Sequence, residues 1–288
     1  MNTAIQAGFF IRKYGMERAA KEIAALGYEN VFYTLQFRYD DPFNTTWGDK
    51  EIGEFCDELK GIFQKNGVKI KYLAANIELF NDHKPDTTAA RIQYCVNAAK
   101  VAKMLGADGV AVKPASFCKA RADLKEASKK NTLEAFDQIK KACDEQGVEM
   151  FILNNFAYPA IGACYGCSGD ELKELCEQYK ARAIVNPIHA QKSAKLASDM
   201  ISVLGDSLEA FLVSDCESGL NSSMMPLMGC LDYLSIKQAL EKAPEDSCIV
   251  LMMDGYVQHF EKFPDNEKVL TALGGYLAGV VDLLAGKI

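Results

Sequence analysis

The chain has 288 residues, of which 49% are hydrophobic and 25% charged, a balance typical of a globular protein. Its formal net charge of −7 disfavours a nucleic-acid partner, because phosphate binding requires clustered lysine and arginine. No apolar run is long enough to span a bilayer, and the amino terminus lacks the pattern of a signal peptide, so neither membrane association nor secretion is expected.

Strands and helices are predicted to alternate along the whole chain. The predicted strands are nearly continuous apolar runs, as in parallel sheets that are buried on both faces. They span residues 5–11, 31–37, 70–78, 109–115, 148–156, 182–191, 208–216 and 248–256. The predicted helices span residues 16–26, 50–65, 87–105, 131–145, 170–179, 193–204, 232–241 and 266–284.

This alternation most simply closes into a (β/α)8 TIM barrel of the α/β class. No composition shift marks a boundary, so a single domain over residues 1–288 is expected. An open doubly wound sheet is the alternative. It would normally carry a G-x-G-x-x-G turn after the first strand, whereas the turn here reads FIRKYGME.

Polar residues follow the apolar part of several strands, at the end where a barrel builds its site. Asn154 and Asn155 follow the fifth strand, and Asn186 and His189 follow the sixth. Asparagine is depleted in strands, so these residues indicate a binding function. We expect the three asparagines to bind substrate, because amides both donate hydrogen bonds to hydroxyls and accept them.

Other strand ends contribute charged groups to the same predicted site. They are Glu78, Lys113, Asp215 with Glu217, and Asp254. The unperturbed pKa of histidine lies near neutrality, so we expect His189 to exchange a proton together with Lys113 or Asp254. The alternatives are a histidine satisfied by backbone groups, a lysine paired with an acid and an aspartate in a turn. Glu78, Asp215 and Glu217 are interpreted as substrate-binding residues, the last two in a loop.

Ten cysteines form a rival set of candidate ligands. Most lie in predicted helices or strands, where cysteine acts as a small buried hydrophobe, and a reducing cytoplasm is therefore expected. Cys164 and Cys167 form a C-x-x-C pair, and Cys118, Cys216 and Cys230 lie in loops on the same face. These thiols could bind zinc or an iron–sulfur cluster, or form a redox pair, but one C-x-x-C alone is a weak signal.

Over nearly its full length the chain resembles the xylose isomerase-like barrels of the sugar phosphate isomerase/epimerase superfamily. The resemblance rests on LGYENVFY, on AAKVAKMLGADGVAV and on the ends of strands five and six. It implies a divalent metal held by a glutamate, an aspartate, a histidine and a glutamate from strands five to eight. Asn154 and Asn186 stand at the first two positions, Leu212 at or near the third, and Met253 or Asp254 near the fourth.

Neutral amides and a leucine are poor ligands for a hard cation, so a degenerate metal site without a metal cofactor is expected. The resemblance then implies an isomerase- or epimerase-like protein that acts on a sugar, sugar phosphate or cyclitol by proton transfer next to a carbonyl. One alternative is a non-catalytic sugar-binding or partner subunit that kept the pocket. Another is a metal enzyme that uses the loop cysteines. The long barrel-end loops are compatible with a homo-oligomer.

Overall fold

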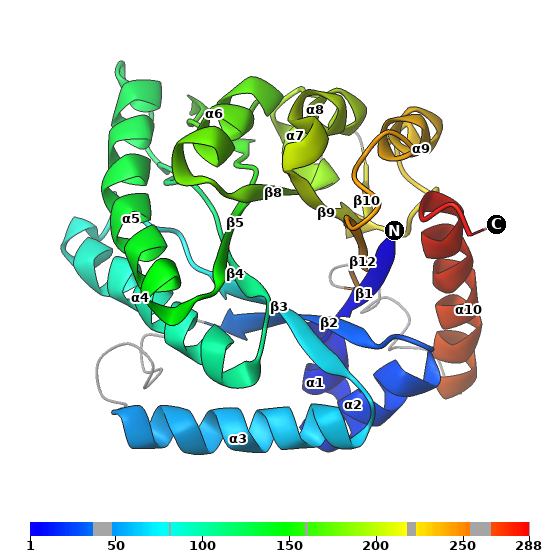
Figure 1. The fold of residues 1–288 in the computed structure, drawn as a ribbon. Coiled ribbons are helices and arrows are strands. Elements are labelled where there is room, and N and C mark those ends of the chain that lie inside the picture. Colours follow the sequence, from blue (N-terminus) through cyan, green and yellow to red (C-terminus); the bar gives the residue numbers. More distant parts are fainter. Residues whose placement is uncertain (37–47, 81, 159–160, 218–222, 254–265, 288) are drawn as a thin grey trace.

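The computed structural model describes residues 1–36, 48–80, 82–158, 161–217, 223–253 and 266–287. Eight parallel strands form a closed barrel in the order β1-β12-β9-β8-β5-β4-β3-β2. Figure 1 shows this ring with helices around its outside, which confirms the predicted (β/α)8 barrel. The barrel strands are β1 (Asn2–Gln6), β2 (Asn30–Gln36), β3 (Lys69–Asn76), β4 (Gly109–Val112), β5 (Glu149–Leu153), β8 (Arg182–Val185), β9 (Leu208–Val213) and β12 (Cys248–Leu251).

The outer layer consists of helices that pack against the barrel and against each other. They are α1 (Gly8–Tyr14), α2 (Met16–Ala25), α3 (Asp49–Lys65), α4 (Thr88–Leu105), α5 (Leu124–Gln146), α6 (Gly169–Tyr179), α7 (Pro187–Lys192), α8 (Ala197–Leu204), α9 (Tyr233–Leu240) and α10 (Asn266–Leu284). Two short hairpins follow β5 and β9: β6 (Ala157–Tyr158) with β7 (Gly162–Ala163), and β10 (Asp215–Cys216) with β11 (Ser223–Met224). Within the described residues, none of the helices has both the length and the apolar character needed to cross a bilayer.

Aromatic side chains fill the inside of the barrel, because alternate residues of each strand point inward. Tyr72 stands between Phe32 and Phe151, with ring centroids 5.9 and 5.4 Å away. Gly109 lets β4 approach β5 closely, since a Cβ there would lie 2.3 Å from the carbonyl oxygen of Glu149. These packed side chains fill the middle of the barrel, so a ligand site can form only toward the carboxyl ends of the strands.

The predicted first strand, residues 5–11, is wrong beyond Gln6. The chain leaves β1 after Gln6 and enters α1, which buries Phe9 and Phe10. A short apolar run such as GFFI fits a buried helix as well as a strand, and periodicity cannot separate the two. The correction matters for the site, because it places Gln6 at the end of a barrel strand and Arg12 on a helix beside it.

The predicted sixth strand, residues 182–191, is also too long. β8 ends at Val185, and the side chain of Asn186 accepts a hydrogen bond of 3.0 Å from the backbone N–H of Ile188. Asn186 is therefore the N-cap of α7, and Pro187 occupies the first helical position, where its missing N–H costs nothing. His189 thus lies in the first turn of a helix rather than at the end of a strand.

Candidate functional site

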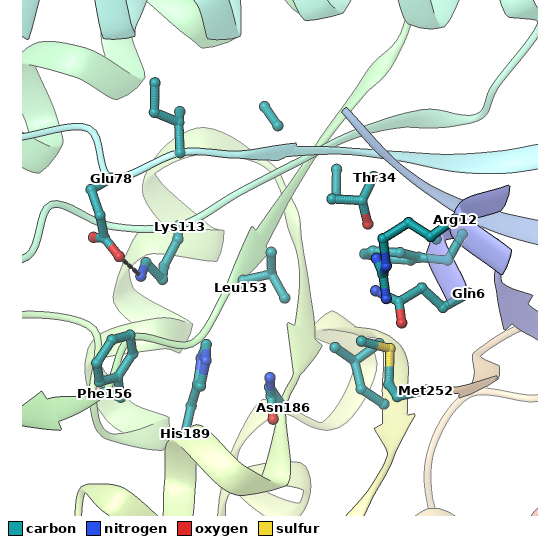
Figure 2. Close-up of a pocket in the computed structure, with 16 residues that line it drawn as sticks. Gln6, Arg12, Thr34, Glu78, Lys113, Leu153, Phe156, Asn186, His189 and Met252 are labelled. Carbon is teal, nitrogen blue, oxygen red and sulfur yellow. Dashed lines mark hydrogen bonds and ion pairs between the residues drawn. The ribbon is translucent and has the colours of Figure 1, made fainter. Parts of the chain in front are cut away.

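A cavity of about 420 Å³ opens at the carboxyl ends of the barrel strands. Its volume lies in the range of small-molecule sites in proteins. The side chains drawn in Figure 2 come from all eight barrel strands or the segments that follow them. The polar residues that line it are Gln6, Arg12, Thr34, Glu78, Lys113, Asn186 and His189, and the larger apolar ones are Phe32, Ile77, Leu153, Phe156, Leu212 and Met252.

An ion pair forms one wall of the cavity. The Nζ of Lys113, just after β4, lies 2.5 Å from the Oε1 of Glu78, just after β3. The same ammonium lies 4.4 Å from the centroid of the Phe156 ring, whose face attracts cations. The other carboxylate oxygen of Glu78, Oε2, is buried and accepts no hydrogen bond from the described residues. The pair therefore offers a cation and a carboxylate oxygen to a ligand.

His189 stands beside this pair as a neutral imidazole. Its Nδ1 lies 2.8 Å from the carbonyl oxygen of Asn154. A carbonyl only accepts hydrogen bonds, so Nδ1 carries the proton and Nε2 is left as an acceptor. Burial, followed by the nearby ammonium of Lys113, lowers the pKa of His189 to about 3. The imidazole is consequently uncharged at neutral pH, and protonating it would add a positive charge close to Lys113 and Lys192.

A second polar group lies across the cavity from the ion pair. Figure 2 shows Gln6, Arg12 and Thr34 on one side and Glu78 with Lys113 on the other, with Leu153 between them. The sequence interpretation missed all three of these residues. Gln6 was hidden because the predicted strand, residues 5–11, placed it near the beginning of the strand. Arg12 carried a usable signal, since it is a polar residue directly after that predicted strand.

Asn154 and Asn155 lie behind the cavity wall and are fully buried. The amide of Asn154 accepts from the backbone N–H of Asn186 at 2.7 Å and donates to its carbonyl at 3.1 Å, which joins the end of β5 to the start of α7. Asn155 donates to the carbonyls of Ala115 and Tyr165 and accepts from Ser116 and the backbone N–H of Phe156. Their side chains position the strand ends, while substrate binding by these two amides stays a prediction.

The predicted acidic residues divide into three cases. Glu78 lines the cavity, as described above. Asp215 is buried in β10, where its carboxylate accepts from the backbone N–H groups of Cys216, Gly229 and Leu231 and so holds the loop after β11. Glu217 is exposed to solvent. Asp254 lies outside the described residues. The structure thus brings together Glu78, Lys113, Asn186 and His189 of the predicted set.

The loop cysteines are not arranged as a metal centre. All ten cysteines are free thiols. Cys164 is buried and accepts a hydrogen bond of 3.4 Å from the backbone N–H of Phe117, and burial raises the pKa of the neighbouring Cys167 thiol to about 12. Across the ranges that the structure describes, no three His, Cys, Asp or Glu side chains come together as metal ligands would. The alternative of a cysteine-based metal enzyme therefore gains no support.

A family profile described as xylose isomerase-like TIM barrel matches residues 20–271. The chain belongs to this family. No curated protein sequence matches it. Membership in the xylose isomerase-like family agrees with the closed barrel and with the position of the cavity at the strand ends.

Solved structures of similar fold cover almost the whole chain. A D-psicose 3-epimerase from Clostridium cellulolyticum H10, crystallised with D-tagatose, has a TM-score of 0.70 at 14% identity and covers 99% of both chains. The IOLI protein, with a bound zinc atom, has a TM-score of 0.73 at 14% identity over 98% of both chains. The 3-keto-D-glucoside 4-epimerase YcjR from E. coli has a TM-score of 0.69 at 11% identity, covering 96% of this chain and 98% of its own. At these identities the likeness shows the fold.

As far as the structure describes the cavity wall, it offers a divalent metal few ligands besides the imidazole of His189 and the carboxylate of Glu78. The side chains that face the cavity from the ends of β5, β9 and β12 are Leu153, Leu212 and Met252. None carries an oxygen or an imidazole nitrogen, which hard divalent cations require. Asn186, after β8, is neutral and uses its side-chain oxygen to cap α7. The only described carboxylate on the cavity wall, that of Glu78, is engaged by Lys113.

Proposed function

We propose that the cavity binds a small polyhydroxylated carbonyl compound, such as a ketose, and moves a proton at the carbon next to its carbonyl without a divalent metal. The observation that carries this proposal is the Lys113–Glu78 pair on the cavity wall, with a buried Glu78 oxygen left without a donor among the described residues. Family membership and the epimerases of similar fold support the substrate class.

The two charged groups have complementary tasks in such a reaction. The ammonium of Lys113 donates a hydrogen bond to the carbonyl oxygen, which makes the neighbouring C–H more acidic. Glu78 takes that proton, the C–H electron pair forms a carbon–carbon double bond, and the carbonyl oxygen becomes an enolate beside Lys113. The protonated Glu78 then returns its proton to the enolate carbon, which regenerates the carboxylate. Exchange of that proton with solvent before its return labels the carbon, and return after the enolate has turned its other face toward Glu78 gives the epimer. Negative charge moves from carboxylate to enolate, so the charge around Lys113 is balanced throughout.

His189 suits a different task from the one predicted from its type. A proton on its Nε2 would add a positive charge to a buried site close to Lys113 and Lys192. Burial, and then the charge of Lys113, lower the pKa of His189 to about 3. Glu78, in contrast, loses charge when it takes a proton. We therefore assign proton removal to Glu78, and to His189 the acceptance of a hydrogen bond from a ligand hydroxyl. Asn186 lines the cavity next to it.

A second candidate function is binding without catalysis. It is favoured by the apolar side chains of Leu153, Leu212 and Met252, because a chain that had lost its cation could keep a sugar pocket but not the reaction. The two functions differ in one measurable respect. A catalyst exchanges a substrate C–H with solvent, whereas a binding protein saturates with the ligand and leaves that hydrogen in place.

Proton NMR in D2O tests the proposal with D-fructose, D-tagatose, D-psicose and their phosphates as a panel. We expect deuterium to enter the carbon next to the carbonyl, and Glu78→Gln to slow this exchange by about 100-fold or more. Lys113→Met should slow it comparably. Lys129→Met, which removes a lysine from an exposed ion pair with Glu174, should leave it unchanged.

Two outcomes would decide against metal-free catalysis. Exchange that is abolished by EDTA and restored by Mn²⁺ would show that a metal does the work assigned to Lys113. Saturable binding of a ketose with no exchange in the unmodified protein would establish the non-catalytic function instead.

A further inference from the structure

The side chain of Gln6 places a buried acceptor oxygen at the end of β1. Gln6 is the last residue of β1, is 5% exposed and lines the cavity. Its Oε1 accepts no hydrogen bond from any residue that the structure describes. Nearly all buried polar atoms in proteins have a partner, so such an atom in a cavity wall calls for a ligand group that donates a hydrogen bond.

Gln6 and Glu78 lie at opposite ends of the cavity, and each has a buried oxygen that could accept a hydrogen bond from a ligand. Figure 2 shows them on opposite sides, with Leu153 between them. Each presents one buried oxygen, Oε1 of Gln6 and Oε2 of Glu78, that accepts from no described donor. A ligand that fills the cavity therefore fits with an O–H or N–H donor at the Gln6 end, with the acidic C–H of the proposed function or a donor at the Glu78 end, and with an apolar or ring face toward the middle.

A hydroxyl is the ligand group that best matches the hydrogen-bonding atoms of Gln6 and Arg12. Arg12, which lines the same side of the cavity, has only N–H donors in its guanidinium, whereas Oε1 of Gln6 only accepts. A hydroxyl donates one hydrogen bond and accepts others, so it is compatible with both side chains. A terminal phosphate or carboxylate only accepts, and it would leave the Gln6 oxygen without a donor.

We propose that Gln6 is a specificity-determining residue that accepts a hydrogen bond from the hydroxyl at the end of the ligand remote from the reacting carbonyl. This rests on the proposed function, which places the carbonyl at Lys113. For a ketohexose bound in that direction, the group read by Gln6 is the 6-hydroxyl. The site then selects free sugars over sugars phosphorylated at that end.

Calorimetric titration with D-fructose and D-tagatose, their 1-deoxy and 6-deoxy analogues and their 6-phosphates tests this proposal. In the unmodified protein we expect removal of the 6-hydroxyl to weaken binding by about 10-fold, the usual effect of leaving a buried partner unpaired. Gln6→Met has a similar shape but no acceptor. It should weaken binding of the parent sugar by about the same factor and abolish the 6-deoxy effect, while any 1-deoxy effect persists.

Two further variants separate recognition from damage to the fold. Gln6→Glu keeps an acceptor oxygen and should retain the preference for the 6-hydroxyl. Gln138→Met replaces an exposed glutamine on α5 and should change nothing. Thermal unfolding of Gln6→Met should begin at no lower temperature than in the unmodified protein, because the substitution removes a buried oxygen that accepts no hydrogen bond from the described residues.

The proposal is wrong if the 6-deoxy penalty is the same in Gln6→Met as in the unmodified protein, or if a 6-phosphate binds more tightly than the free sugar. Absence of saturable binding for the whole panel would overturn both this inference and the proposed function. Discrimination through Gln6 without any C–H exchange would support the inference and refute catalysis.

Discussion

Lowering the pH from 7 to 5 should lower the free energy of unfolding of this protein, and the contribution of His189 to this loss can be calculated. Its pKa in the folded chain is about 3, because the ring is buried and faces Lys113, whereas an ordinary histidine titrates near ~6.5. Between these values the unfolded chain binds a proton that the folded chain does not, so the free energy of unfolding falls as the pH falls. Each pH unit below ~6.5 contributes about 1.4 kcal/mol, which gives a loss of about 2 kcal/mol at pH 5.

Urea unfolding at pH 7 and pH 5 measures this loss, and a comparison of variants isolates it from other titrating groups. His189→Gln keeps an N–H that can donate to the carbonyl of Asn154 but cannot be protonated, so it should lose about 2 kcal/mol less than the unmodified protein. His83→Gln, at an exposed position, should behave like the unmodified protein within about 0.5 kcal/mol. Equal pH dependence in the unmodified protein and His189→Gln would refute the lowered pKa.

Two packing predictions complete the set. Gly109→Ala should lower the free energy of unfolding by about 2 kcal/mol or more, because its Cβ would lie 2.3 Å from the carbonyl oxygen of Glu149. Gly61→Ala on α3, where a Cβ meets nothing within 4 Å, should instead raise it by about 0.5–1 kcal/mol; equal effects at the two glycines would contradict the close approach of β4 to β5. Asn155→Ala should lower the free energy of unfolding by about 3 kcal/mol, since it leaves several buried hydrogen-bonding groups without a partner. Asn131→Ala removes one hydrogen bond on a helix surface and should lower it by less than about 1 kcal/mol. Urea unfolding compares each pair, and a small cost at Asn155 would indicate that water replaces its amide.

Much of the site could be located from the sequence, because parallel strands in a barrel bring their carboxyl ends together. Glu78 and Lys113 were picked out as polar residues after apolar runs, and the structure joins them as an ion pair 2.5 Å long. The direction of each side chain could not be read in the same way. Leu153 and Asn154 are neighbours in sequence, yet only Leu153 lines the cavity, while the Asn154 amide bonds to the backbone of Asn186.

The order of apolar runs and polar strand ends was enough to determine the (β/α)8 barrel, since local periodicity and the burial of both sheet faces act over a few residues at a time. The charge state of His189, and the lack of a donor to the Gln6 oxygen among the described residues, were decided only by the tertiary structure. Both depend on groups from other parts of the chain that fold against them: Lys113 and Asn154 for the histidine, and the neighbouring strand β2, in which Phe32 is in register with Gln6, for the glutamine. The protonation of a histidine and the pairing of a buried oxygen depend on burial and on groups nearby in space, and neither can be predicted from the adjacent residues in the sequence.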